Sequence, residues 1–121
     1  MAVSASYLQW VVEQLNSAAP DGVTSRRMFG GAGLYCQEFF FGLVADDALY
    51  FREGIANTAD FAAAGSAQFD PFPERMKPMP YRAVPEEILE DSEALAGWLT
   101  KAVAAAREAK TAQPKTAKGR E

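Results

Sequence analysis

Between residues 26 and 52, short strand-like runs rich in apolar and aromatic residues alternate with breaks of two or three residues. The runs are Arg26–Phe29, Ala32–Cys36, Phe39–Val44 and Ala48–Arg52. Parallel strands need a crossover of about a dozen or more residues, so connections this short allow only antiparallel pairing. We therefore predict an antiparallel meander at the centre of the fold.

The breaks between these runs differ in chemistry. Gly30-Gly31 predicts a bulge or kink at a place where another backbone comes close, with Ala32–Cys36 continuing the same strand. Gln37-Glu38 predicts a tight hairpin, although this pair is poor chemistry for a two-residue turn. Asp46-Asp47 predicts the next turn. The run between these two turns is bulky on both faces, which is typical of a central strand covered on at least one side.

Helical patterns flank the meander. An apolar stripe at i, i+3, i+4 and i+7 predicts a helix at about residues 5–18. A shorter helix is predicted at Ala56–Ala64, with Gly65 just past its end, and a brief one after Pro85. The last helix is capped by Asp91 or Ser92, and its stripe is expected to lie across the sheet. That stripe consists of Leu95, Trp98, Leu99, Ala102, Val103 and Ala106.

Five prolines fall between residues 69 and 85, which excludes a helix and any long central strand there. Short edge strands near Gln68–Phe72 and Met79–Ala83 remain open. At 121 residues, one domain is the natural count. We predict a sheet-and-helix domain over residues 1–109, followed by a basic flexible tail over residues 110–121.

The chain lacks the usual catalytic chemistry. It contains no histidine and one cysteine, Cys36. This excludes His-based acid–base catalysis, Ser-His triads, His-ligated zinc and Cys-x-x-Cys redox pairs. We interpret Cys36 as a buried small apolar residue. The glycines at 30, 31 and 33 match neither the dinucleotide fingerprint nor the phosphate loop. We predict no cofactor and no enzymatic activity.

Two acidic clusters are candidates for a metal site, Asp46-Asp47 and the group at Glu86, Glu87, Glu90 and Asp91. Paired carboxylates can hold Mg²⁺. Turn chemistry accounts for the first cluster, and the favourable placement of acids at a helix start accounts for the second. We therefore expect no metal site.

The charge is unevenly distributed. Residues 1–106 carry seven Lys/Arg against fourteen Asp/Glu, whereas residues 107–121 carry five against two. An acidic body repels nucleic-acid phosphate, although the tail could supply a weak tether. The single cysteine fits a reducing compartment, and neither a signal peptide nor a membrane span is apparent. We expect a cytoplasmic protein with no membrane partner.

The segment from Arg26 to Tyr35 combines two arginines, three glycines and large apolar residues. Neighbouring residues on a strand face opposite sides, so Arg26 and Arg27 should diverge. They could anchor an acidic partner or a phosphate, or form salt bridges to Asp46, Glu53 or the C-terminal helix. Tyr35, Phe40, Tyr50 and Tyr81 could form an exposed aromatic patch or pack in a core. The candidate interaction surface comprises Arg26, Arg27, Phe29, Gly30, Gly31, Tyr35, Tyr50 and Tyr81.

Three separated blocks resemble one known family. They are Arg26-Arg27-Met28-Phe29-Gly30-Gly31-x-Gly33-Leu34-Tyr35, then Phe41-Gly42-Leu43-Val44-Ala45-Asp46-Asp47-x-Leu49-Tyr50, then Tyr81-x-x-Val84-Pro85-Glu86-Glu87-x-Leu89-Glu90-Asp91. Together these blocks resemble the TfoX N-terminal domain family, which includes the N-terminal half of the bacterial competence regulator TfoX (Sxy). The resemblance spans about Tyr7 to Ala106.

This resemblance implies an α+β fold similar to secretion chaperones: a curved antiparallel β-sheet of about five strands with N-terminal and C-terminal helices packed on one side. It also implies a non-enzymatic regulatory role, since TfoX-like proteins are held to be coactivators of competence genes alongside a cyclic-AMP-responsive transcription factor. Regulators of the TfoX type usually have a second, C-terminal helical domain, so the resemblance is to a stand-alone copy. The first hairpin turn, often Asp-Gly in relatives, is Gln37-Glu38 here.

The favoured hypothesis is a protein-interaction module in a regulatory complex. Its contact surface would be the sheet face and the Arg26–Gly31 segment. An antiparallel sheet with open edges and one aromatic face also favours a homodimer. The alternative is a nucleic-acid-binding accessory protein that uses the basic tail together with Arg26, Arg27, Arg75, Lys77 and Arg82.

Overall fold

A computed structural model of the chain describes residues 5–19, 22–28, 31–69 and 79–112. Four helices and five strands lie within these ranges. In chain order they are α1 (Ala5–Ala18), β1 (Thr24–Met28), β2 (Gly31–Cys36), β3 (Phe39–Ala45), β4 (Ala48–Arg52), α2 (Thr58–Ala64), β5 (Tyr81–Ala83), α3 (Glu86–Leu89) and α4 (Ser92–Ala112). None of the helices described is long and apolar enough to cross a membrane.

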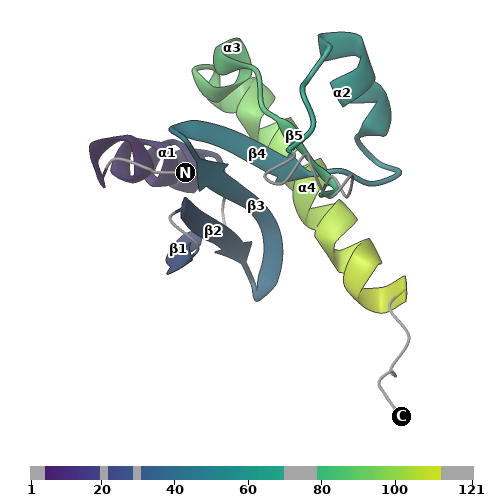
Figure 1. Cartoon of the computed structure of the whole chain (residues 1–121), viewed down its shortest axis with the longest axis horizontal. Coiled ribbons are helices and arrows are strands. Elements are labelled where there is room, and N and C mark those ends of the chain that lie inside the picture. Colours follow the sequence, from purple (N-terminus) through teal and green to yellow (C-terminus); the bar gives the residue numbers. More distant parts are fainter. Residues whose placement is uncertain (1–4, 20–21, 29–30, 70–78, 113–121) are drawn as a thin grey trace, which may run out of the picture.

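The strands form one sheet in the order β1-β2-β3-β4-β5, with every neighbouring pair antiparallel (Figure 1). The predicted meander is therefore confirmed, and β3 is its central strand. Helices α1 and α4 contact each other, and α4 also packs on β3 and β4. The fold is α+β, with the N-terminal and C-terminal helices packed against a five-stranded antiparallel sheet.

One prediction about the first strands is wrong. The segment around Gly30-Gly31 does not continue a single kinked strand, because Met28 pairs with Gly31 and β1 runs antiparallel to β2. The chain thus reverses direction between Met28 and Gly31, and a hairpin replaces the expected bulge. The close backbone approach predicted there is nevertheless present at Gly31, where an added Cβ would collide with the carbonyl oxygen of Val44.

The two hairpin turns that follow are tight, as predicted. Gln37 and Glu38 have φ angles of 51° and 74°, and Asp46 and Asp47 have φ angles of 53° and 54°. Two consecutive left-handed residues are the signature of the mirror-image turn that matches the twist of paired strands. The β2–β3 turn therefore adopts this geometry without the Asn or Gly that usually supplies it.

The main core lies between the helices and one face of the sheet, which we call the inner face. Val11 and Leu15 of α1 are fully buried there, as is Leu95 of α4. The helical stripes predicted from the sequence therefore pack as expected. The sheet contributes Leu34, Cys36, Phe41, Val44, Leu49 and Phe51 to this core.

Local hydrogen bonds fix the ends of helices α2 and α4. Helix α2 begins after Asn57, whose buried side chain accepts a hydrogen bond from the Gly54 amide (2.7 Å) and donates one to the Arg52 carbonyl (2.8 Å). It ends at Gly65 in a left-handed conformation, as predicted. Helix α4 is capped by Asp91, whose carboxylate accepts hydrogen bonds from the first-turn amides.

The proline-rich segment is only partly described. Its predicted second edge strand is present as β5; of the first, near Gln68–Phe72, only Gln68 and Phe69 are described, and Gln68 forms an isolated bridge with Arg82. Residues 70–78 lie outside the described residues. At the C-terminus, α4 continues to Ala112, and residues 113–121 of the predicted tail also lie outside that part of the chain.

Candidate interaction surface

The sheet face opposite α1 and α4 carries a second apolar cluster. Because side chains alternate along a strand, Tyr35 and Tyr50 point away from the inner core formed by their neighbours. Leu43, Ala45, Phe69 and Tyr81 form the buried part of this cluster, with Phe40 and Tyr50 packed against it. We call the following set the outer aromatic face: Arg26, Tyr35, Phe40, Tyr50, Arg52, Phe69 and Tyr81.

The rings of this face contact one another across the strands. Tyr35 stacks on Phe40 with ring centroids 5.1 Å apart, and Phe40 lies 5.7 Å from Tyr81. A separate pair joins Tyr50 to Phe69 at 4.8 Å. These separations fall in the range in which aromatic pairs attract beyond simple burial. The rings therefore form two groups, and packing of Phe40, Tyr50, Phe69 and Tyr81 joins these groups in one apolar cluster.

Arginines border this row of rings. The Arg26 guanidinium lies 5.5 Å from the centroid of the Tyr35 ring, and that of Arg52 lies 5.5 Å from the centroid of Tyr81. Both distances allow cation–π attraction. The Arg52 Nε is buried without a hydrogen-bond partner among the described residues. The mixture of arginine and aromatic rings is typical of protein interfaces.

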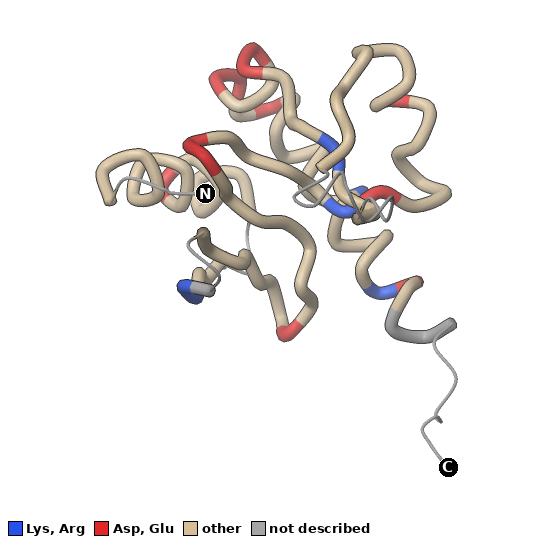
Figure 2. The backbone as a smooth tube through the Cα atoms, viewed as in Figure 1, with Lys and Arg blue, Asp and Glu red and all other residues tan. Residues whose placement is uncertain are grey.

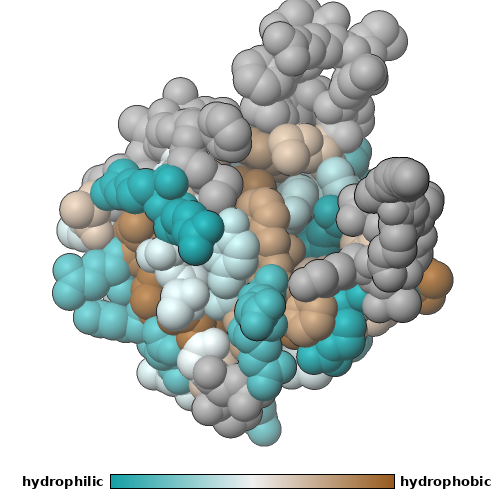
Figure 3. All heavy atoms as spheres, turned by 90° about the horizontal axis from the view of Figure 1, so that it is seen from below, coloured by the Kyte–Doolittle hydropathy of each residue, from teal (hydrophilic) through white to brown (hydrophobic). Residues whose placement is uncertain are grey.

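Exposure divides the predicted aromatic patch into two groups. Tyr35, Phe40 and Tyr50 are half-buried, whereas Tyr81 is only 3% exposed and belongs to the core of the cluster. Burial raises the pKa of Tyr81, and burial together with the nearby Asp46 raises that of Tyr50. Both phenols are therefore uncharged at neutral pH. On the face of the molecule drawn in Figure 3, hydrophobic residues reach the surface between hydrophilic ones.

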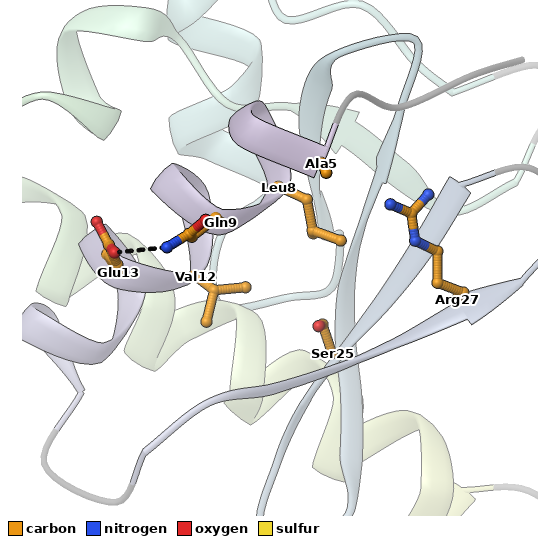
Figure 4. Close-up of a pocket in the computed structure, with 7 residues that line it drawn as sticks. All are labelled: Ala5, Leu8, Gln9, Val12, Glu13, Ser25 and Arg27. Carbon is orange, nitrogen blue, oxygen red and sulfur yellow. Dashed lines mark hydrogen bonds between the residues drawn. The ribbon is translucent and has the colours of Figure 1, made fainter.

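Arg27 lies on the other side of the sheet from Arg26, as predicted. It lines a groove of about 280 Å³ between α1 and β1, together with Leu8 and Val12 (Figure 4). Among the described residues neither arginine forms an ion pair, so the salt bridges proposed to Asp46, Glu53 or the C-terminal helix are not found there. Both arginine side chains are exposed.

The remaining predicted residues are not brought together on this surface. Gly31 is buried against the backbone of β3, so it serves strand packing. Phe29 and Gly30 lie outside the described residues. Arg52 and Phe69 were missed by sequence reasoning. Strand alternation predicts that Arg52 shares a face with Tyr50, yet Arg52 was not included in the candidate surface; Phe69 precedes the proline-rich segment and carries no periodic signal.

The alternative nucleic-acid set is also dispersed. Arg82 is engaged with the Glu53 carboxylate at 3.0 Å and the Ser66 carbonyl at 3.1 Å. Arg75 and Lys77 lie outside the described residues. In Figure 2, the basic residues of β1 lie at one margin of the molecule, while acidic residues gather at the β3–β4 turn and around α3. The described residues therefore do not form a continuous basic track.

Glu53 is an acidic residue whose charged carboxylate has a structural role. Burial would raise the pKa of its carboxyl, but hydrogen bonds from Thr58 and Arg82 lower it below the ordinary value. The carboxylate thus links β4 to the start of α2 and to β5. Within the described ranges, no group of three or more potential ligands could hold a metal ion.

The family model of the TfoX N-terminal domain matches residues 13–106. This chain belongs to the TfoX N-terminal domain family. The match covers α1 from Glu13 onward, the entire sheet and most of α4, so it includes both faces of the sheet. No curated protein matches the chain. The TfoX N-terminal domain is a regulatory domain family that is not known as catalytic.

Proposed function

We propose that this TfoX N-terminal domain is a non-enzymatic regulatory module that binds a protein partner through its outer aromatic face. The observation that carries the proposal is the ring row on the side of the sheet away from α1 and α4. Tyr35 and Phe40 are stacked and half-buried, and Arg26 lies over the first ring. Covering such rings would bury apolar area at low conformational cost, since they are already held in place.

The regulated process that family membership suggests is transcription, with the domain acting as a co-regulator of the TfoX type. A competence role is part of this proposal. Its direct test is the change in transcript levels when the gene is deleted and then restored with the wild-type or a surface-altered chain. Restoration by both forms alike would remove the link between this surface and regulation.

The binding surface itself can be tested by capture from the native cell. A tagged chain carrying Tyr35→Ala and Tyr50→Ala should lose the partner that the wild-type chain retains. The matched control is Tyr7→Ala, which removes a half-buried tyrosine from α1 on the helical side. Circular dichroism should first establish that each variant is folded. Recovery of the same partner by the double variant and the control would contradict the proposal.

Self-association through the same face is a secondary form of this proposal, since a second copy would also cover the rings. Sedimentation at micromolar concentration distinguishes the two occupants. A dimer lost on Tyr35→Ala would identify the second copy as the occupant, whereas a monomer of 13.1 kDa would leave the face to another protein.

A further inference from the structure

The two edges of the sheet differ in how they are covered. At β5, the Ala83 amide donates to the Ala67 carbonyl (2.9 Å) and the Phe69 amide to the Tyr81 carbonyl (2.8 Å), so residues 67–69 occupy that edge. Strand β1 pairs with β2 alone among the described strands. Thr24, Ser25, Arg26 and Arg27 are all exposed. Alternate backbone groups of β1 therefore have no strand partner within the described part of the chain and can pair with another strand.

A groove runs alongside this open edge. Its lining comes from α1 and β1: Ala5, Leu8, Gln9, Val12, Glu13, Ser25 and Arg27. Figure 4 shows the apolar side chains of Leu8 and Val12 between two polar ends, with Arg27 at one end and the hydrogen-bonded Gln9 and Glu13 at the other. We call this the edge groove. Side chains of an added strand that face α1 would enter it.

The edge groove is held in shape by Asn16 near the end of α1. The Asn16 side chain accepts a hydrogen bond from the Val23 amide (2.7 Å) and donates one to the Val23 carbonyl (3.2 Å). Val23 itself is buried. The residue that leads into β1 is thus tied to the helix, so the groove exists before any partner binds and little ordering cost remains.

Charge selects among the possible occupants. The sequence of β1, Thr-Ser-Arg-Arg-Met, has two positive charges and no acid. Antiparallel pairing of β1 with a second copy would set arginine against or diagonal to arginine, which is destabilising. The segment at residues 113–121 carries Lys115, Lys118 and Arg120 against Glu121, so it does not complement these charges either. An acidic segment of another protein does.

We propose that β1 accepts an extended acidic segment of a protein partner as a sixth strand. One acidic side chain of the segment would face Arg27 at its end of the edge groove, and an apolar side chain would contact Leu8 and Val12. A second acidic side chain would meet Arg26 on the opposite face. This mode of binding rests on the proposed function, and it names the chemistry of the partner.

The competing explanation is that the two arginines only protect an open edge from aggregation. A library of random twelve-residue peptides, displayed on their encoding RNA and selected against the full chain, decides between the two. Under our proposal the selected pool is enriched in adjacent pairs of acidic residues, with an apolar residue two positions away from one of them on the same face of the strand. A pool with no acidic enrichment would leave edge protection as the explanation and overturn the proposal.

Individual peptides from the pool provide the quantitative test. Arg27→Glu should weaken their binding by about tenfold or more, because a charge pair becomes a repulsion. The matched control is Arg107→Glu on α4, whose guanidinium lies 5.0 Å from the centroid of the Phe39 ring in β3; it makes the same charge change away from β1 and, once shown to be folded, should alter binding less than about twofold. Arg27→Gln should fall between the wild type and Arg27→Glu. Equal effects of the two charge reversals would reject the assignment.

Backbone pairing has its own signature. On peptide binding, hydrogen exchange of the β1 amides that point away from β2 should slow, while the already paired β2 and β3 amides should change little. If peptide binding slows hydrogen exchange elsewhere but not in β1, the added-strand model is wrong even if the peptides are acidic. Tyr50→Ala, on β4 and away from Arg26, should leave peptide binding intact, so loss of the cellular partner in this single variant tests the outer aromatic face separately.

Discussion

Glu53 illustrates how single side chains join elements that are distant in the sequence. Its carboxylate accepts hydrogen bonds from Thr58 (2.7 Å) and Arg82 (3.0 Å), which lie at the start of α2 and in β5. The Arg82 guanidinium also reaches the Ser66 carbonyl (3.1 Å). One ionised group thus connects the end of β4 to both segments that follow it.

Protonation of Glu53 should therefore destabilise the fold. Its pKa is lower in the folded chain than the ordinary value of 4.5. A lowered carboxyl pKa contributes stability above the unfolded value, and that contribution disappears as pH falls through the folded pKa. The difference in unfolding free energy between the wild type and Glu53→Gln should be largest near pH 7 and shrink below pH 4.5, as urea unfolding across pH would show.

A second variant identifies the source of this effect. Arg82→Ala removes one of the groups that lower the Glu53 pKa, so the pH-dependent component should be smaller than in the wild type. Identical pH profiles for the wild type, Glu53→Gln and Arg82→Ala would show that the carboxylate carries no linked stability.

At the scale of elements, the two hairpins have the same turn geometry with different residues. Gln37 and Glu38 have positive φ, and so do Asp46 and Asp47. An ordinary side chain in the left-handed region costs about 1–2 kcal/mol, and Asp tolerates that region better than Gln or Glu. The β2–β3 turn is therefore the more strained of the two.

Replacing this turn should stabilise the domain. The double substitution Gln37→Asn with Glu38→Gly should raise the unfolding free energy by about 1 kcal/mol, since Asn-Gly adopts this turn without strain. The same replacement at Asp46 and Asp47 should give a smaller gain. Urea midpoints measured at constant slope check both variants. An unchanged or lower midpoint for the first variant would mean that the turn is not strained.

The strand patterns were read correctly from the sequence where alternation was regular. Leu34 and Cys36 face the inner core, whereas Tyr35 stacks on Phe40 on the outer face, as period two requires. The first hairpin was missed because Gly30-Gly31 suits a bulge, a kink and a tight turn equally well. Only the pairing of Met28 with Gly31 distinguishes them.

At the scale of the whole molecule, the sheet carries an apolar cluster on each face. The inner cluster joins α1, α3 and α4 to the strands, and the outer one is bordered by Phe69. Close contact between the sheet and α4 depends on Gly54, just after β4. A Cβ at this position would lie 2.7 Å from the Ala105 Cβ and 3.2 Å from the Ala105 Cα.

Two Gly→Ala substitutions should consequently have opposite signs. Gly54→Ala forces α4 away from the sheet and should destabilise the domain by about 1–3 kcal/mol. Gly97→Ala, where an added Cβ meets no atom within 4 Å, should stabilise α4 by about 0.5–1 kcal/mol. Thermal unfolding of both variants provides the measurement. A shift in the same direction for both would contradict this account of helix docking.

The candidate surface could be predicted only in part from the sequence. Divergence of Arg26 and Arg27 follows from strand alternation alone. Burial of Tyr81 does not, because it depends on Phe40 and Leu43 being brought beside it by the sheet. The edge groove was not predicted, since its lining combines one face of α1 with β1 and no local pattern marks that meeting.

The sequence by itself determined the helices, the antiparallel meander apart from its first hairpin, and the family, because periodicity, turn length and motif blocks are local properties of the chain. The tertiary structure alone decided which sheet edge stays open and which aromatic rings stay exposed. Both depend on contacts between different segments of the chain, such as Phe69 with Tyr81 beside β5 and Asn16 of α1 with Val23 just before β1. Under our proposals, those contacts determine where a partner binds.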